Sequence, residues 1–275
     1  MTMLRALVVA SLSLSLMAQS KAPDALAQAR DLYNAQRYDD AIRTAGEAQA
    51  IPAFAPAATV VLARALLERY RQTSQATDLD LARSALKTVD ASALDAHDRV
   101  ELTIAIGTSL YLDQTYNLDD RFSAAAEQFE LALARADLLD AHARDELFDW
   151  WAVSLDRQAQ QGPESARRLV YERVLARAEQ ELAHNDASAA GAYWLAAAAR
   201  GVGDLTRAIG ASVAGWVRAA TLGDRGDGLR LDLDRLMRQV ILPERAHELV
   251  PTGDAHPTLA LLEQQWMQVT GQWAR

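Results

Sequence analysis

The chain has 275 residues, half of them hydrophobic, and carries a formal net charge of −9 with no cysteine. A chain of this length and apolar content can bury a sizeable core without disulfides. The missing cysteines exclude disulfide frameworks, zinc-thiolate sites and cysteine nucleophiles. The acidic charge disfavours nucleic acid as a partner, because phosphate backbones repel an acidic surface.

Residues 1–22 have the pattern of a cleaved secretory signal peptide. Arg5 supplies a positive start, residues 6–18 are mostly apolar, and Ala18 and Ser20 form a small-x-small cleavage site. Without cysteine the exported chain cannot carry a lipoprotein anchor, and no later apolar run reaches the roughly 18 residues of a membrane span. We therefore expect a periplasmic protein with no stable membrane insertion after signal cleavage.

The remainder of the chain is predicted to be all-α. Alanine, the residue with the best helix propensity, is abundant, and the alternating β-branched pattern of strands is missing from long stretches. The predicted helix pairs are, in chain order, 24–36 with 38–50, 55–71 with 78–90, 95–112 with 119–136, 141–160 with 163–184, and 187–200 with 204–221.

The pattern changes after residue 221. Three glycines and alternating charges in 221–230 predict a loop. A helix is expected over 230–248, a second loop over 251–257, and a last helix over 258–272. We interpret 222–275 as an irregular helical pair that caps the preceding helices, since terminal repeats are atypical.

A small residue recurs at a near-constant interval along the predicted helices. The steps between its copies are 41, 43, 41 and 42 residues, and the copies are Ala41, Ala82, Ala125, Ala166 and Ala208. A bulky residue stands three places before each alanine except Ala166, which has Pro163 there. Self-similarity at a fixed period of this size is typical of proteins built from repeated helix pairs.

These stripes resemble the second helix of tetratricopeptide (TPR) repeats. The resemblance rests on Tyr38, Ala41, Ala45 and Ala48, on Phe122, Ala125, Phe129 and Ala132, and on the stretch 192–209. It implies an all-α, right-handed α-solenoid of about six helix-turn-helix pairs, five of them in 23–221. The period near 42 is longer than the family's usual length of about 34, since the helices and loops here are longer.

The chain also resembles the T component associated with tripartite ATP-independent periplasmic (TRAP) transporters, through its exported start, its long repeats and Tyr193-Trp194 on an alanine-rich helix. That resemblance implies a solute-binding protein as partner. It also implies a small ligand handled in an enclosed pore, which we would place along Trp194, Gly210 and Trp216.

Large side chains on the predicted helices are the candidate groove residues, because aromatic and arginine side chains dominate binding hot spots. They are Trp150, Trp151, Tyr193, Trp194, Arg200 and Trp216. Adjacent residues point about 100° apart on a helix, so at most one of each neighbouring aromatic pair can face the core. Packing between repeats is the alternative role for each of them.

The sequence contains no motif for catalysis, a metal or a cofactor. No two of the five histidines are three or four residues apart, and no serine lies in a nucleophile elbow. We therefore predict a non-catalytic scaffold or adaptor that binds a periplasmic protein or peptide in a concave groove. The TRAP T component is the first alternative and an enzyme the second, and the oligomeric state stays open.

Overall fold

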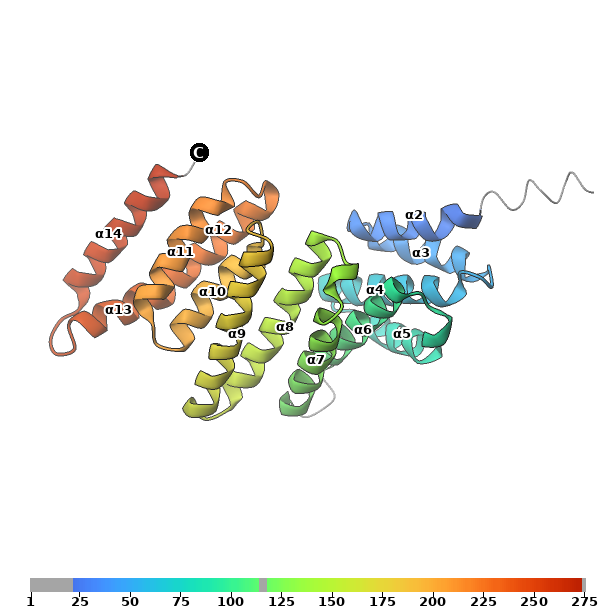
Figure 1. Cartoon of the computed structure of the whole chain (residues 1–275), viewed down its shortest axis with the longest axis horizontal. Coiled ribbons are helices and arrows are strands. Elements are labelled where there is room, and N and C mark those ends of the chain that lie inside the picture. Colours follow the sequence, from blue (N-terminus) through green and yellow to red (C-terminus); the bar gives the residue numbers. More distant parts are fainter. Residues whose placement is uncertain (1–21, 114–117, 274–275) are drawn as a thin grey trace, which may run out of the picture. The chain divides into compact units, whose positions relative to one another are not determined.

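A computed structural model describes residues 22–113 and 118–273, and every regular element in these ranges is a helix (Figure 1). The all-α prediction is therefore confirmed for this part of the chain. The signal peptide predicted for 1–22 lies outside the described residues, except for Ala22, where helix α2 begins. None of the described helices combines the length and the apolar character that crossing a membrane would need.

The chain forms two compact units, divided near residue 116. The elements of the first unit are α2 (Ala22–Asn34), α3 (Tyr38–Gln49), α4 (Ala55–Thr73), α5 (Ala76–Thr88), the 3-10 turn η1 (Ala91–Ala93) and α6 (Ala96–Tyr111). Helix α4 packs against α2, α3, α5 and α6. It can do so because Val60, Ala63 and Leu67 bury its inner side almost completely.

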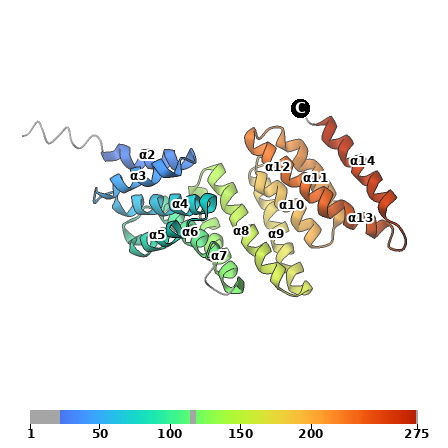
Figure 2. The same ribbon diagram turned by 180° about the vertical axis from the view of Figure 1, so that it is seen from behind.

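The second unit contains the longer helices. Its elements are α7 (Leu118–Leu133), η2 (Ala136–Leu138), α8 (Ala141–Gln161), α9 (Glu164–His184), α10 (Ala189–Gly201), α11 (Leu205–Ala219), α12 (Asp224–Leu236), the π-helical turn η3 (Met237–Ile241), α13 (Leu242–Leu249) and α14 (His256–Gln272). Helix α10 occupies the centre, in contact with α8, α9, α11 and α12 (Figure 2). Most predicted boundaries match to within two or three residues.

The repeated alanines pack at helix contacts, with one exception. Ala41, Ala82, Ala125 and Ala208 have no exposed surface, so a larger side chain would not fit at any of them. Ala166 is exposed. The repeat position predicted there is therefore wrong. In α9 the buried stripe begins further along, at Tyr171.

The loop predicted for 221–230 is also wrong, because α12 begins at Asp224 and includes two glycines of that stretch. Gly226 lies in the first turn of α12, directly against the end of α11. A Cβ atom there would come within 2.9 Å of the carbonyl carbon of Ala219 and closer still to its oxygen. The glycine thus marks a close approach of two backbones rather than a flexible loop.

The predicted helix 230–248 is interrupted by the π-helical turn η3. Pro243 follows this turn at the start of α13. Proline has no N–H to donate to the carbonyl four residues earlier, so an unbroken α-helix cannot pass through it. A π turn just before the proline lets the helical path continue.

A buried carboxylate ties α8 to α9. Glu181 is 3% exposed and accepts hydrogen bonds from Arg144 Nε at 2.7 Å and from Arg177 Nε at 2.9 Å. Burial acts to raise the pKa of Glu181, but the two guanidinium groups outweigh it and hold that pKa below its ordinary value. The ionised form is therefore part of the folded structure.

We expect Gly226→Ala to destabilise the second unit by about 2 kcal/mol or more, because the new methyl group would meet backbone atoms that cannot rotate away. Gly228→Ala, in the same helix, is the matched control. Its added Cβ would have no neighbour within 4 Å, so a gain of about 0.5–1 kcal/mol is expected. Urea unfolding measures both, and equal stability of the two variants would contradict this account of Gly226.

We expect Glu181→Gln to cost about 1–3 kcal/mol at neutral pH, because it leaves two arginines without their charged partner. A lowered native pKa stabilises the fold above the ordinary value of 4.5 and ceases to do so as the pH falls through the native value. The difference in unfolding free energy between wild type and variant should therefore shrink below pH 4.5. A constant difference across denaturant titrations at several pH values would refute the ion-pair explanation.

Candidate binding face on helix α10

Two of the six predicted groove residues have their indole rings buried between helices. Trp151 is 2% exposed and donates from Nε1 to Glu130 Oε2 at 2.6 Å, which links α8 to α7. Trp194 is 5% exposed and donates from Nε1 to Asp149 Oδ1 at 2.7 Å, which links α10 to α8. Both side chains hold neighbouring helices together and offer little surface to a partner.

Their sequence neighbours are only partly buried, as the 100° turn between adjacent helical residues requires. Trp150 stacks on Phe129 of α7 with ring centroids 5.9 Å apart. Tyr193 meets the edge of Trp194 at 5.3 Å and is partly open to solvent. Of the predicted aromatic residues, Trp150, Tyr193 and Trp216 are partly buried and so keep some exposed surface.

Tyr193 belongs to a partly exposed stripe along α10. Tyr193, Ala197 and Arg200 follow one another at intervals of four and three residues, which places them on one side of the helix. Of the residues between them, Trp194, Ala196, Ala198 and Ala199 are buried and Leu195 is partly buried. The stripe carries a phenol near one end and a guanidinium at the other.

Aspartates on two of the helices that contact α10 act electrostatically on the Tyr193 phenol. Burial raises the pKa of its phenol above the ordinary value, and the negative charges of Asp232 on α12 and of Asp156 and Asp149 on α8 raise it further. Within the described residues the phenol oxygen makes no hydrogen bond. We call the surface formed by Tyr193, Ala197, Arg200 and these three aspartates the Tyr193 face.

The Arg200 end of this face is held in place by a second set of contacts. Arg200 forms an ion pair with Glu244 of α13, and its Nε lies 2.9 Å from Oε2. Tyr171 of α9 donates its hydroxyl to Asp156 at 2.7 Å, and its ring lies directly against Gly201, where a Cβ would clash with it. Burial and this hydrogen bond both raise the pKa of Tyr171, so the phenol stays protonated.

The sixth predicted groove residue, Trp216, contacts a different part of the unit. It lies on α11 and meets Trp266 of α14 at 5.3 Å, with the Arg230 guanidinium 5.5 Å from its ring. Its indole nitrogen is buried and has no hydrogen-bond partner in the part of the chain that the structure describes. Trp216 therefore packs at the contact between α11 and α14. Gly210, which the sequence placed with Trp216 along a pore, has no atom within 4 Å of the position that a Cβ would take.

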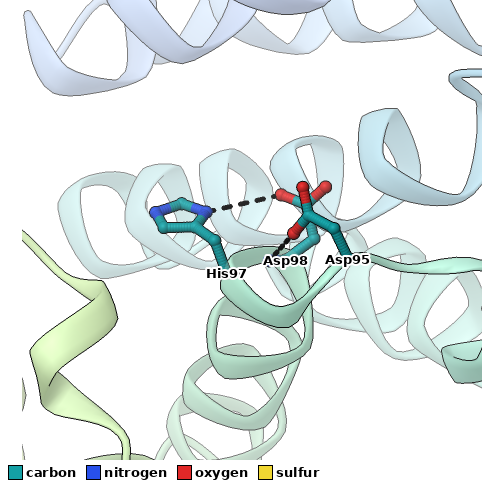
Figure 3. Close-up of side chains that lie close together, drawn as sticks. All are labelled: Asp95, His97 and Asp98. Atoms are coloured by element: carbon teal, nitrogen blue, oxygen red, sulfur yellow. Dashed lines mark hydrogen bonds and ion pairs between the residues drawn. The ribbon is translucent and has the colours of Figure 1, made fainter.

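One cluster in the first unit has the side chains of a metal site (Figure 3). Ligand atoms of Asp95, His97 and Asp98 lie within 4.8 Å of one another. The same carboxylates already have partners, because Asp98 accepts from Arg30 of α2 at 2.5 Å and Asp95 accepts from the Asp98 backbone N–H at 2.8 Å. The cluster caps α6 and fastens α2 to it.

Sequence reasoning missed the three aspartates of the Tyr193 face. Asp149 and Asp156 are seven residues apart, which puts them on one side of α8, and that spacing was the available signal. Nothing in the sequence shows that α8 and α12 flank Tyr193 from opposite sides.

Comparison with protein-family models, with curated proteins and with solved structures finds no significant match. Chemically, the Tyr193 face combines negative charge, an aromatic ring and an unpaired hydroxyl. Such a surface attracts cations and offers them hydrogen-bond acceptors and a ring face.

The ionisation of Tyr193 reports this environment directly. In a spectrophotometric titration, the difference between wild type and Tyr193→Phe should show a phenol whose pKa exceeds 10.0. Asp232→Asn should move that pKa downward, because it removes a neighbouring negative charge. Asp227→Asn, an exposed aspartate on the same helix, is the control and should leave it in place. If both variants shift it equally, Asp232 has no specific role at this face.

Proposed function

We propose that this chain is an exported, non-catalytic, TPR-like scaffold that binds a basic segment of a partner protein on the Tyr193 face. Helix pairs within each unit would stack as in an α-solenoid with repeats near 42 residues. The row α2, α4, α6 and the row α8, α10, α12, in which alternate helices touch, support that arrangement. Export rests on the predicted signal peptide.

One observation carries the binding proposal. The Tyr193 side chain is partly exposed, its phenol makes no hydrogen bond within the described residues, and negative charges on α8 and α12 raise the pKa of that phenol. An unpaired polar group in such surroundings gains a partner on binding, and tyrosine buries large area at low entropic cost. A lysine or arginine side chain supplies both the donor and the opposite charge.

The negative charge around the phenol is only partly neutralised from within the chain. Asp156 accepts a hydrogen bond from a neutral group, the Tyr171 hydroxyl, which leaves its charge in place. Asp232 has Arg235 at 3.5 Å, a long contact between side chains that are both more than half exposed. Exposed pairs of this kind contribute little, so the charge remains available to a partner.

The test uses the chain without its predicted signal and two acetylated, amidated peptides of equal length. One alternates lysine with alanine, and the other has glutamate in place of lysine. We expect the lysine peptide to bind more tightly, with affinity that falls as salt is added, because exposed charges are screened. Tyr193→Ala should weaken binding about tenfold or more, as loss of a central aromatic anchor does. Calorimetric titration measures each affinity.

Asp232→Asn should also weaken the lysine peptide, whereas Asp227→Asn on the same helix should not. Circular dichroism confirms that each variant is folded. Equal affinity for the two peptides, or unchanged affinity after Tyr193→Ala, would refute the proposed binding mode.

A further inference from the structure

The interruption of the repeat at Ala166 coincides with a pocket in the second unit. The hollow has a volume of about 360 Å³, and its lining comes from α7, the end of α8 and the start of α9. Its volume lies at the small end of the range for ligand sites. Ala166, the exposed copy of the repeated alanine, forms part of its wall.

The hollow lies beside the copy of the repeat that lacks a large side chain. At three of the other four copies the residue three places before the alanine is large and buried, with Leu79 at 7%, Phe122 at 6% and Leu205 at 9% exposure, and at the fourth it is the partly buried Tyr38. The corresponding residue before Ala166 is Pro163, which is exposed. A missing aromatic or leucine side chain in a packed array leaves space that neighbours do not refill.

The polar groups around this space are suited to an anion. Arg167 lines it and makes no ion pair or side-chain hydrogen bond within the described residues. The amides of Gln158 and Gln161 and the hydroxyl of Ser123 add neutral donors, and no carboxylate contributes to the lining. A lining with one arginine and no carboxylate contrasts with the net charge of −9 of the whole chain.

In a second hollow, which lies in the first unit, the arginines of the lining are paired with carboxylates of the same lining. It measures about 440 Å³ and its lining includes Arg37 and Arg69. There Arg37 pairs with Asp40 at 2.5 Å and Arg69 with Asp39 at 2.7 Å, both of which also line the hollow. Those guanidinium groups are neutralised from within the chain, whereas the guanidinium of Arg167 is not.

We propose that the pocket beside Ala166 binds a small aliphatic carboxylate. The carboxylate would pair with the Arg167 guanidinium, whose planar fork matches two carboxylate oxygens. The carbon chain of the ligand would lie against Ala166 and Val170, and the side-chain amides of Gln158 and Gln161 would donate hydrogen bonds to its carboxylate. This site does not depend on the Tyr193 face, and the two can be tested separately.

Isovalerate is the probe, and its amide, isovaleramide, is the uncharged control of the same shape. Saturation-transfer NMR on the chain without its predicted signal should show isovalerate binding with a dissociation constant of about 1 mM, as expected of so small a ligand. Arg167→Gln should weaken it about tenfold, because the ion pair is lost. Ala166→Leu should abolish binding by filling the space.

The matched control is Arg168→Gln, since Arg168 is the next residue, is 65% exposed and pairs with Glu172 instead. It should bind isovalerate as wild type does, and circular dichroism should show all three variants folded. Equal binding of isovalerate and isovaleramide, no binding of isovalerate, or equal losses in the Arg167 and Arg168 variants would each overturn the proposal. Displacement by an equal concentration of inorganic phosphate would overturn the assignment to carboxylates.

Discussion

Close approach between helices is the constraint on which the second unit depends. Gly226 lets α12 start against the last turn of α11, and Gly215 of α11 has space for no more than a hydrogen beside Leu233. Gly201 receives the ring of Tyr171 in the same way. Where the residues at a contact are glycines, the two backbones set the distance between the helices. The larger side chains must then fit the space that remains between those helices. The position of the Tyr193 face follows from that spacing.

Indole-to-carboxylate hydrogen bonds connect the helices that this packing brings together. Trp151 reaches Glu130, Trp194 reaches Asp149, and Trp266 of α14 reaches Asp234 of α12 at 2.8 Å. Each bond satisfies a buried indole N–H with a charged acceptor, which makes it stronger than a neutral hydrogen bond. The indole N–H groups of Trp151, Trp194 and Trp266 are therefore occupied by contacts within the chain. Trp150 and Tyr193, the less buried neighbours of Trp151 and Trp194, are better placed to contact a partner.

The two proposed sites arise from opposite departures from the repeat. On α10 a large residue, Tyr193, is only partly buried, and the negative charges of aspartates on α8 and α12 act on its phenol. At the start of α9 a large residue is missing, and Arg167 borders the resulting hollow. The first site carries excess negative charge and the second an unpaired positive charge, so they favour ligands of opposite sign. A chain of stacked helices can thus present two chemistries within one unit.

Sequence patterns alone determined the helical class, most helix boundaries and the buried alanines, because these depend on local propensity and on a period that the chain itself displays. The same patterns showed that only one residue of Trp150-Trp151 and of Tyr193-Trp194 could face the core. The glycines of 221–230 led to a wrong loop prediction, because glycine occurs both in loops and where two backbones approach closely. Only the contact between Gly226 and the backbone of Ala219 distinguishes the two cases. The aspartates around Tyr193 and the hollow beside Ala166 were decided by the tertiary structure. They bring together residues far apart in the chain, and no local periodicity specifies which side of a helix a distant neighbour will cover.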